Sequence, residues 1–296
     1  MLIAAAIPFF GTGGLRKPIN QTTAYRLLTH EGKGRGVFPL IPYGPNENGL
    51  TEQARPPTWF STWFLKDKNS STYHILGTDE SGRDVLVRLI HGARVSLAVG
   101  FVATGIAAVL GILFGAWAGY AGGKVDLLFS RVIEIMMCIP TFFLILTVIA
   151  VIDQRSILNI MLIIGFTSWT GYARLMRGEV FKQKQLDYAT GAIALGASPW
   201  RAVFRHILPN AMSPVFVSIS FGIASAILTE SSLSFLGIGV QPPTPTWGEL
   251  LNQAKSLPTH LWWLVVFPGV CIFLGVFSYN LVGDGIRDAL DPRLSK

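Results

Sequence analysis

Residues 187–209, DYATGAIALGASPWRAVFRHILP, form a polar and basic stretch between two strongly apolar segments. Its second half predicts a short amphipathic helix, because Ser198 is a favourable N-cap, Pro199 suits the first helical position and Pro209 marks a stop. Four apolar side chains follow the spacing i, i+3, i+4, i+7 and should share one face: Trp200, Val203, Phe204 and Ile207. The pattern predicts either a helix that docks on another protein or one that lies on a bilayer surface.

The rest of this stretch is built from smaller and charged residues. Gly196 separates the amphipathic helix from residues 187–195, in which several small side chains leave a surface that another protein can approach closely: Ala189, Gly191, Ala192 and Ala194. Arg201 and Arg205 project away from the predicted apolar face.

The composition indicates an all-α integral membrane protein in a lipid bilayer. Of 296 residues, 50% are hydrophobic and 14% are charged, and the mean hydropathy is +0.47. Cys138 and Cys271 lie inside apolar runs, so neither a disulfide framework nor a metal site is indicated. The net charge of +7 is scattered between apolar segments, which argues against nucleic acid as a partner.

Five segments are apolar and long enough to be predicted as complete transmembrane helices. They are 95–123, 132–152 with Pro140 available to kink it, 156–173, 207–229 continuing towards Gly237, and one span within 256–283. Residues 1–10 are apolar but too short to cross a bilayer. We interpret them as the outer end of an incomplete first transmembrane helix, which makes about six, with a short interfacial anchor as the alternative.

Basic residues predict the orientation of these helices. Lys and Arg gather in the loop of residues 178–209, in the C-terminal tail of residues 286–296, and around the turn at Lys124 and Arg131. Counting crossings places all three regions on one side, which the positive-inside rule makes cytoplasmic. We therefore predict a long extracytoplasmic loop at residues 11–90, a transmembrane domain at residues 91–285, and a cytoplasmic tail.

Four motifs, in order along the chain, resemble one family of membrane proteins. Thr190-Gly191-Ala192, Gly196 and Leu208-Pro209 resemble the Glu-Ala-Ala…Gly…Leu-Pro loop of ATP-binding-cassette (ABC) importer permeases, with Thr190 and Gly191 in place of Glu and Ala. Residues 77–84, GTDESGRD, match the Gly-Thr-Asp-x-x-Gly-Arg-Asp signature of the oligopeptide/dipeptide branch. The segments 233–247, LSFLGIGVQPPTPTW, and 283–293, GDGIRDALDPR, are similar to segments of the same branch.

The resemblance implies the transmembrane domain of a type I ABC importer in the bacterial inner membrane, carrying oligopeptides or dipeptides. It implies a homologous second permease subunit that completes the pathway, two ATPase subunits that bind ATP and Mg, and an extracytoplasmic substrate-binding protein. The chain itself would need no cofactor. The residues expected to couple to the ATPases are Asp187, Thr190, Gly191, Ala192, Gly196, Trp200, Arg201, Phe204, Arg205 and Pro209.

The chain lacks recognisable motifs for hydrolysing ATP or peptides. It has no G-x-x-x-x-G-K-[ST] phosphate loop, no H-E-x-x-H helix and no G-x-S-x-G elbow, so we expect a transport subunit rather than an enzyme. Three alternatives stay open: a permease for nickel or another small solute, a secondary transporter, and a membrane-embedded enzyme. Ion-coupled transport would call for intramembrane charges, which are few here.

Charged residues in or near the spans are candidates for function, because charge in hydrocarbon is costly. Glu230 is a candidate for the substrate pathway; alternatively, neighbouring hydroxyls hydrogen-bond its carboxylate or it lies near the interface. Glu134 alternatively pairs with Arg131 at i, i+3. For Asp79, Arg83 and Asp84 we favour local pairing and helix capping over substrate contact.

Overall fold

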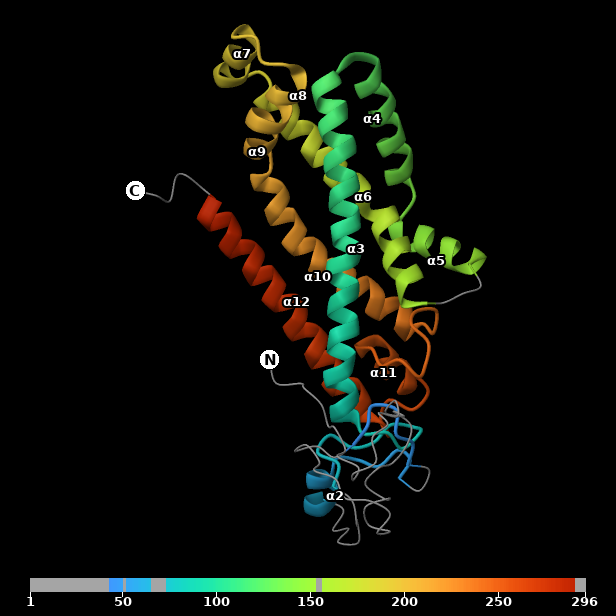
Figure 1. Ribbon diagram of the computed structural model, residues 1–296. Coiled ribbons are helices and arrows are strands. Elements are labelled where there is room, and N and C mark those ends of the chain that lie inside the picture. Colours follow the sequence, from blue (N-terminus) through green and yellow to red (C-terminus); the bar gives the residue numbers. More distant parts are fainter. Residues whose placement is uncertain (1–42, 50–51, 65–72, 153–155, 291–296) are drawn as a thin grey trace, which may run out of the picture. The chain divides into compact units, whose positions relative to one another are not determined.

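The computed structural model describes residues 43–49, 52–64, 73–152 and 156–290 (Figure 1). The predicted incomplete first helix at residues 1–10 lies outside the described residues. All regular elements in the described residues are helical, and an isolated antiparallel bridge joins Thr78 and Asp84. The predicted all-α class is therefore confirmed for this part of the chain.

The described residues divide into two compact units. The first takes the chain up to Val95 together with Gln241–Cys271, and the second takes Ser96–Val240 together with the chain from Ile272 onward. The first unit contains α2 (Thr58–Phe64) and α11 (Trp247–Gln253). The division falls inside two long helices, α3 (Val85–Ala121) and α12 (Trp262–Leu290).

Three helices are long and apolar enough to cross a membrane: α3, α12 and α10 (Ser213–Phe235). A fourth candidate is the pair α4 (Gly123–Cys138) and α5 (Thr141–Val151), which bend by 84° at their junction. Pro140 causes this break, since it has no backbone N–H and forces Ile139 into an extended conformation with φ −93° and ψ 122°. The kink predicted at Pro140 is confirmed and is sharp enough to end one helix and begin another.

The predicted span at 156–173 is the first part of a longer helix, α6 (Ile157–Gln183). It has enough residues to cross a membrane but is not among the candidate spans; Asn159 and the polar run at residues 167–172 lower the hydropathy of its first half, and Arg174, Arg177 and Lys182 lie in its second half. Several helix boundaries also differ from the predicted ranges. The helix α3 begins at Val85 rather than after residue 90, α2 interrupts the predicted loop, and α12 continues to Leu290 beyond residue 285.

Close packing of α3 on α6 organises the second unit. A Cβ atom on Gly115 would lie 2.5 Å from the carbonyl oxygen of Ala173, and one on Gly119 would lie 2.7 Å from that of Arg177. Only glycine allows the two backbones to approach this closely, as small residues do in membrane helix pairs. One buried apolar cluster then joins α3 and α6 to the segments that follow; it includes Ala107, Met176, Val180, Ala189, Ile207, Ala211 and Val215.

A buried ionic network holds the first unit together. Asp79 accepts hydrogen bonds from the backbone N–H of Arg83 at 2.9 Å and from its Nε at 2.6 Å. Asp84 caps α3 by accepting from the Val87 N–H at 2.9 Å, and its other oxygen lies 2.8 Å from Nδ1 of His74. The predicted pairing and capping roles of Asp79, Arg83 and Asp84 are confirmed.

Candidate functional site

The segment from residue 187 to residue 211 stands at one end of α6 and α10, beside the turn between α3 and α4 (Figure 1). It consists of α7 (Asp187–Ala194), α8 (Pro199–Arg201), the π-helix η1 (Ala202–Ile207) and α9 (Leu208–Ala211). We call it the α7–α9 segment. It contains all ten residues predicted to contact an ATPase.

Polar contacts tie the end of α6, which leads into this segment, to the α3–α4 turn. Arg177 forms a bidentate ion pair with Asp126 of α4, in which Nη2 donates to Oδ2 at 2.8 Å. Lys184 donates from Nζ to the carbonyl oxygen of Tyr120 at 2.7 Å and lies 5.1 Å from the centre of that ring. The end of α6 that leads into the α7–α9 segment is therefore fixed to the α3–α4 turn by charged groups.

The first helix, α7, buries one side and exposes the other. Ala189 is fully buried, whereas Tyr188, Ile193 and Leu195 are exposed. Thr190 is exposed and its hydroxyl donates locally, to the carbonyl of Asp187 at 3.1 Å. A Cβ atom on Gly191 would meet no atom within 4 Å. The two positions that depart from the family pattern thus face open space.

Gly196 ends α7 with two characteristic backbone hydrogen bonds. Its own N–H donates to the carbonyl of Ile193 at 2.9 Å, and the N–H of Ala197 donates to the carbonyl of Ala192 at 3.1 Å. This is the Schellman pattern, which requires a left-handed conformation at the residue after the cap. Gly196 has φ +87°, a conformation that favours glycine.

The helical run that starts with α8 at Pro199 begins as predicted but does not stop at Pro209. Ser198 accepts a hydrogen bond from the Arg201 N–H at 3.4 Å, and Pro199 occupies the first turn. The prediction that Pro209 is a stop is wrong, because the helical run continues to Ala211. The chain enters a π-helical register, in which the Leu208 N–H donates to the carbonyl of Val203, so the helix passes through a proline that has no N–H to offer.

The π-helical register also divides the predicted apolar face. Trp200 and Phe204 are 74% and 51% exposed, and their rings stack with centroids 5.3 Å apart. Ile207 is fully buried instead, as is Ala202. A π-helix needs more residues for each turn than an α-helix, so Ile207 rotates out of the face that the α-helical spacing predicts.

The result is an exposed aromatic pair on a buried base. Leu195, which is 91% exposed, adds to the exposed apolar surface of the segment, and Arg201 and Arg205, which directly follow Trp200 and Phe204 in the sequence, are exposed as well. Exposed apolar side chains rimmed by charges are typical of protein interaction sites. In the described part of the chain, no group of three or more His, Cys, Asp and Glu side chains is placed to hold a metal ion.

The other predicted candidate, Glu230 on α10, is fully buried. Its carboxylate accepts hydrogen bonds from the hydroxyl of Ser234 at 2.8 Å and from that of Ser96 at 3.2 Å. This geometry confirms the alternative in which neighbouring hydroxyls satisfy Glu230. Glu134 likewise pairs with Arg131, at 2.7 Å on an exposed surface.

The sequence did not predict which buried side chains pair with the motif at residues 77–84. Arg88 is fully buried, lies 3.3 Å from Asp79 and donates to Glu249 at 2.7 Å. Its charge at the start of an apolar helix was the available signal for a buried partner. The sequence contained no signal that the partner would be Glu249, 161 residues away.

Curated proteins from several bacteria are similar to this chain over most of its length. The di/tripeptide transport system permease protein DppC of Pseudomonas aeruginosa is 40% identical over 255 residues, or 86% of this chain and 82% of that protein. The dipeptide permease DppC of Escherichia coli K12 is 41% identical over 87% of this chain and 83% of its own length. The glutathione transport system permease protein GsiD of Pectobacterium atrosepticum is 39% identical over 98% of this chain and 96% of that protein.

Solved structures show the same fold at low sequence identity. A chain of the MetNI methionine ABC transporter, in an inward-facing conformation, matches 67% of this chain and 96% of its own length with a TM-score of 0.54 and 15% identity. The family model for the binding-protein-dependent transport system inner membrane component matches residues 111–296. The chain therefore belongs to this family of inner membrane components: it is a permease subunit of an ABC transporter and carries neither an ATPase site nor a cofactor of its own.

Proposed function

We propose that this chain is a permease subunit of an ATP-driven importer for oligopeptides or dipeptides and that it forms half of the translocation pathway. Relatives named for dipeptides, di/tripeptides and glutathione support a peptide as the cargo. The chain would work with a homologous second permease subunit, two ATPase subunits and an extracytoplasmic substrate-binding protein. It would have about six transmembrane helices, with residues 11–90 outside the cell and residues 178–209 and the tail from residue 286 in the cytoplasm.

The exposed Trp200–Phe204 pair is the observation that carries the proposed coupling role. Exposing two large, stacked aromatic rings to water is unfavourable, and contact with an ATPase subunit would bury them. Asp187, Thr190, Gly191 and Ala192 would form the adjacent part of the contact. Arg201 and Arg205 would pair with acidic groups at its rim.

The buried base of the α7–α9 segment supports transmission of a movement into the membrane helices. Ala189, Ile207 and Ala211 are fully buried in one cluster with Met176 of α6 and Val215 of α10. Close-packed side chains transmit a displacement to their neighbours. ATP-driven closure of the ATPases would therefore move α6 and α10 through this segment and switch the permease between two packings.

The structure suggests a packing role for Glu230 rather than a place in the pathway. Its two carboxylate oxygens already accept hydrogen bonds from serine hydroxyls within the second unit. A solute would have to displace these donors before it reached the carboxylate, which would leave a buried charge short of partners.

A cysteine cross-link from Phe204→Cys to the ATPase, in membranes with and without ATP, tests the coupling role. We expect a specific adduct whose yield changes with nucleotide. Phe143→Cys on α5 is the matched control, because Phe143 is as exposed as Phe204 but lies outside the α7–α9 segment, and it should give no adduct. Absence of an adduct, together with labelling of Phe204→Cys from outside the cell, would overturn both the coupling role and the topology.

A further inference from the structure

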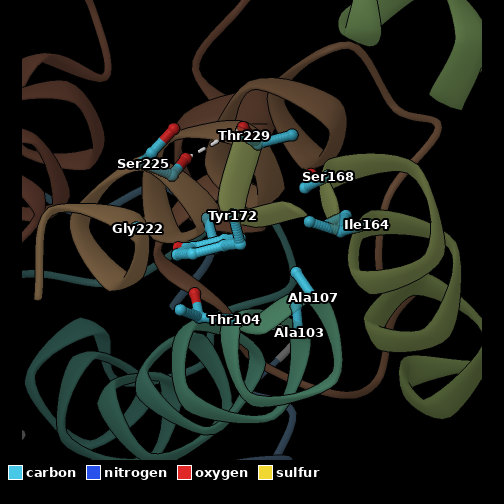
Figure 2. A pocket seen from close by; sticks show the side chains of 10 residues that line it. Ala103, Thr104, Ala107, Ile164, Ser168, Tyr172, Gly222, Ser225 and Thr229 are labelled. Atoms are coloured by element: carbon cyan, nitrogen blue, oxygen red, sulfur yellow. Dashed lines mark hydrogen bonds between the residues drawn. The ribbon is translucent and has the colours of Figure 1, made fainter. Parts of the chain in front are cut away.

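A cavity of about 170 Å³ lies inside the second unit, away from the α7–α9 segment. Its walls come from three helices: Ala103, Thr104 and Ala107 of α3; Ile164, Ser168 and Tyr172 of α6; and Gly222, Ser225, Ala226 and Thr229 of α10. Figure 2 shows Tyr172 reaching across it, with Thr104 on one side and Ser225 and Thr229 on the other.

The polar groups of this cavity are all hydroxyls, and several are free to bind a ligand. Within the described residues, the hydroxyls of Thr104, Ser168 and Ser225 make no hydrogen bond. Serine and threonine in a helix commonly donate to the carbonyl four residues earlier, as Thr229 does to Ser225 at 2.8 Å. Three hydroxyls at this cavity therefore have donors and acceptors that their own helices do not satisfy.

The position of Tyr172 is set by glycines on either side of it. A Cβ atom on Gly222 would overlap the Tyr172 hydroxyl, and one on Gly111 would overlap its Cβ atom. The Tyr172 hydroxyl reaches the carbonyl of Ser218 only at 3.5 Å. The two glycines therefore make room for a large side chain whose polar end remains available at the edge of the cavity.

The lining selects the chemical class of the ligand. No charged side chain is among the ten that line the cavity, so a charged group would lose its hydration there without gaining a partner. Hydroxyls both donate and accept hydrogen bonds, which suits a neutral amide that has one N–H and one C=O. The cavity volume of about 170 Å³ is close to the roughly 150 Å³ of an engineered apolar cavity that binds benzene, so it is large enough for one amide with a small side chain.

We propose that this cavity is a binding subsite for an uncharged amide of the transported solute, such as a peptide bond with a small side chain. The inference rests on the proposed peptide-import function and adds a place within this chain where the cargo is held. The methyl groups of Ala103, Ala107 and Ala226 and the side chain of Ile164 contact the apolar part of the ligand, and the free hydroxyls orient its amide.

Thiol protection in the complete transporter tests the subsite directly. In a chain with Cys138 and Cys271 replaced by serine, Ser225→Cys places a thiol at the exposed edge of the cavity. We expect N-acetylalaninamide, a neutral diamide, to slow its labelling by N-ethylmaleimide at least about threefold, whereas zwitterionic alanine at equal concentration does not. Adding Thr104→Val should abolish this protection, and adding Thr147→Val, whose hydroxyl bonds to the Phe143 carbonyl outside the cavity, should preserve it.

Peptide uptake provides the second readout. We expect Thr104→Val combined with Ser168→Ala to lower the uptake of tetra-alanine, whose central amide is separated from both charged termini, about tenfold, the effect of losing one or two hydrogen bonds, while Thr147→Val leaves it unchanged. No protection by the diamide, or equal protection by alanine, would show that the cavity holds only water and would overturn the inference. Loss of the nucleotide-sensitive Phe204→Cys adduct in the parent chain would instead contradict the proposed function.

Discussion

Gly196 and Gly191 differ in backbone conformation although both face open space. A Cβ atom at either position would meet no atom within 4 Å, but Gly196 has φ +87° and Gly191 lies inside α7. Gly196→Ala should therefore cost about 1–2 kcal/mol through backbone strain alone. We expect fewer peptides imported per ATP hydrolysed, because the Schellman turn sets the direction in which the chain enters α8.

Gly191→Ala is the matched control for this change. The added methyl group meets nothing, and alanine is the better helix former by about 1 kcal/mol. Import per ATP should stay the same in this variant, because alanine is the residue that the family's Glu-Ala-Ala pattern has at this position and the proposed contact with the ATPase should therefore accept it. A larger Gly196→Arg change should uncouple transport while the complex remains inserted in the membrane. If Gly196→Arg left uptake unchanged, the role assigned to the α7–α9 segment would be wrong.

At the scale of elements, glycines on one face of α3 set its distance from α6. A Cβ atom on Gly115 would lie 2.5 Å from the Ala173 carbonyl oxygen and 2.9 Å from Cβ of Met176, so Gly115→Ala must push the helices apart. Overpacking of this kind costs about 1–3 kcal/mol. We expect a lower thermal unfolding temperature for the purified transporter in detergent.

Gly105 supplies the comparison on the same helix. A Cβ atom there would meet no atom within 4 Å, so Gly105→Ala should leave the unfolding temperature unchanged or raise it slightly. Equal destabilisation by the two changes would mean that contact with α6 is not what requires glycine at position 115.

At the scale of the whole molecule, stability depends on charges buried in the first unit. Arg88 is fully buried between Asp79 and Glu249. Replacing Arg88 by methionine leaves the buried Glu249 without its cation and leaves Asp79 with Arg83 alone, which should cost about 3–5 kcal/mol and reduce the amount of folded transporter in the membrane. Quantitative blotting of membranes and proteolysis of the first unit measure this effect.

Arg131→Met is the control for the loss of an arginine. Its ion pair with Glu134 is exposed on both sides and is worth less than about 1 kcal/mol. The amount of transporter should not change. Similar losses for the two variants would show that burial of Arg88 does not contribute as proposed.

The sequence by itself determined the class of the protein, its family resemblance and several points at which helices begin, break or end. The break at Pro140, the caps at Ser198 and Asp84 and the turn at Gly196 were readable because each acts on the backbone within a few residues of itself. Long apolar runs likewise predict membrane helices without reference to their neighbours.

Only the tertiary structure decided which of these features lie together. The burial of Ile207 below an exposed Trp200, the pairing of Arg88 with Glu249, and the hydroxyl-lined cavity all depend on side chains from separate helices. A residue's spacing along one helix predicts its face but not what the neighbouring helices place against that face. The sequence thus named the residues that we propose contact the ATPase, and packing decided that two aromatic rings point outward while Ala189, Ile207 and Ala211 are buried.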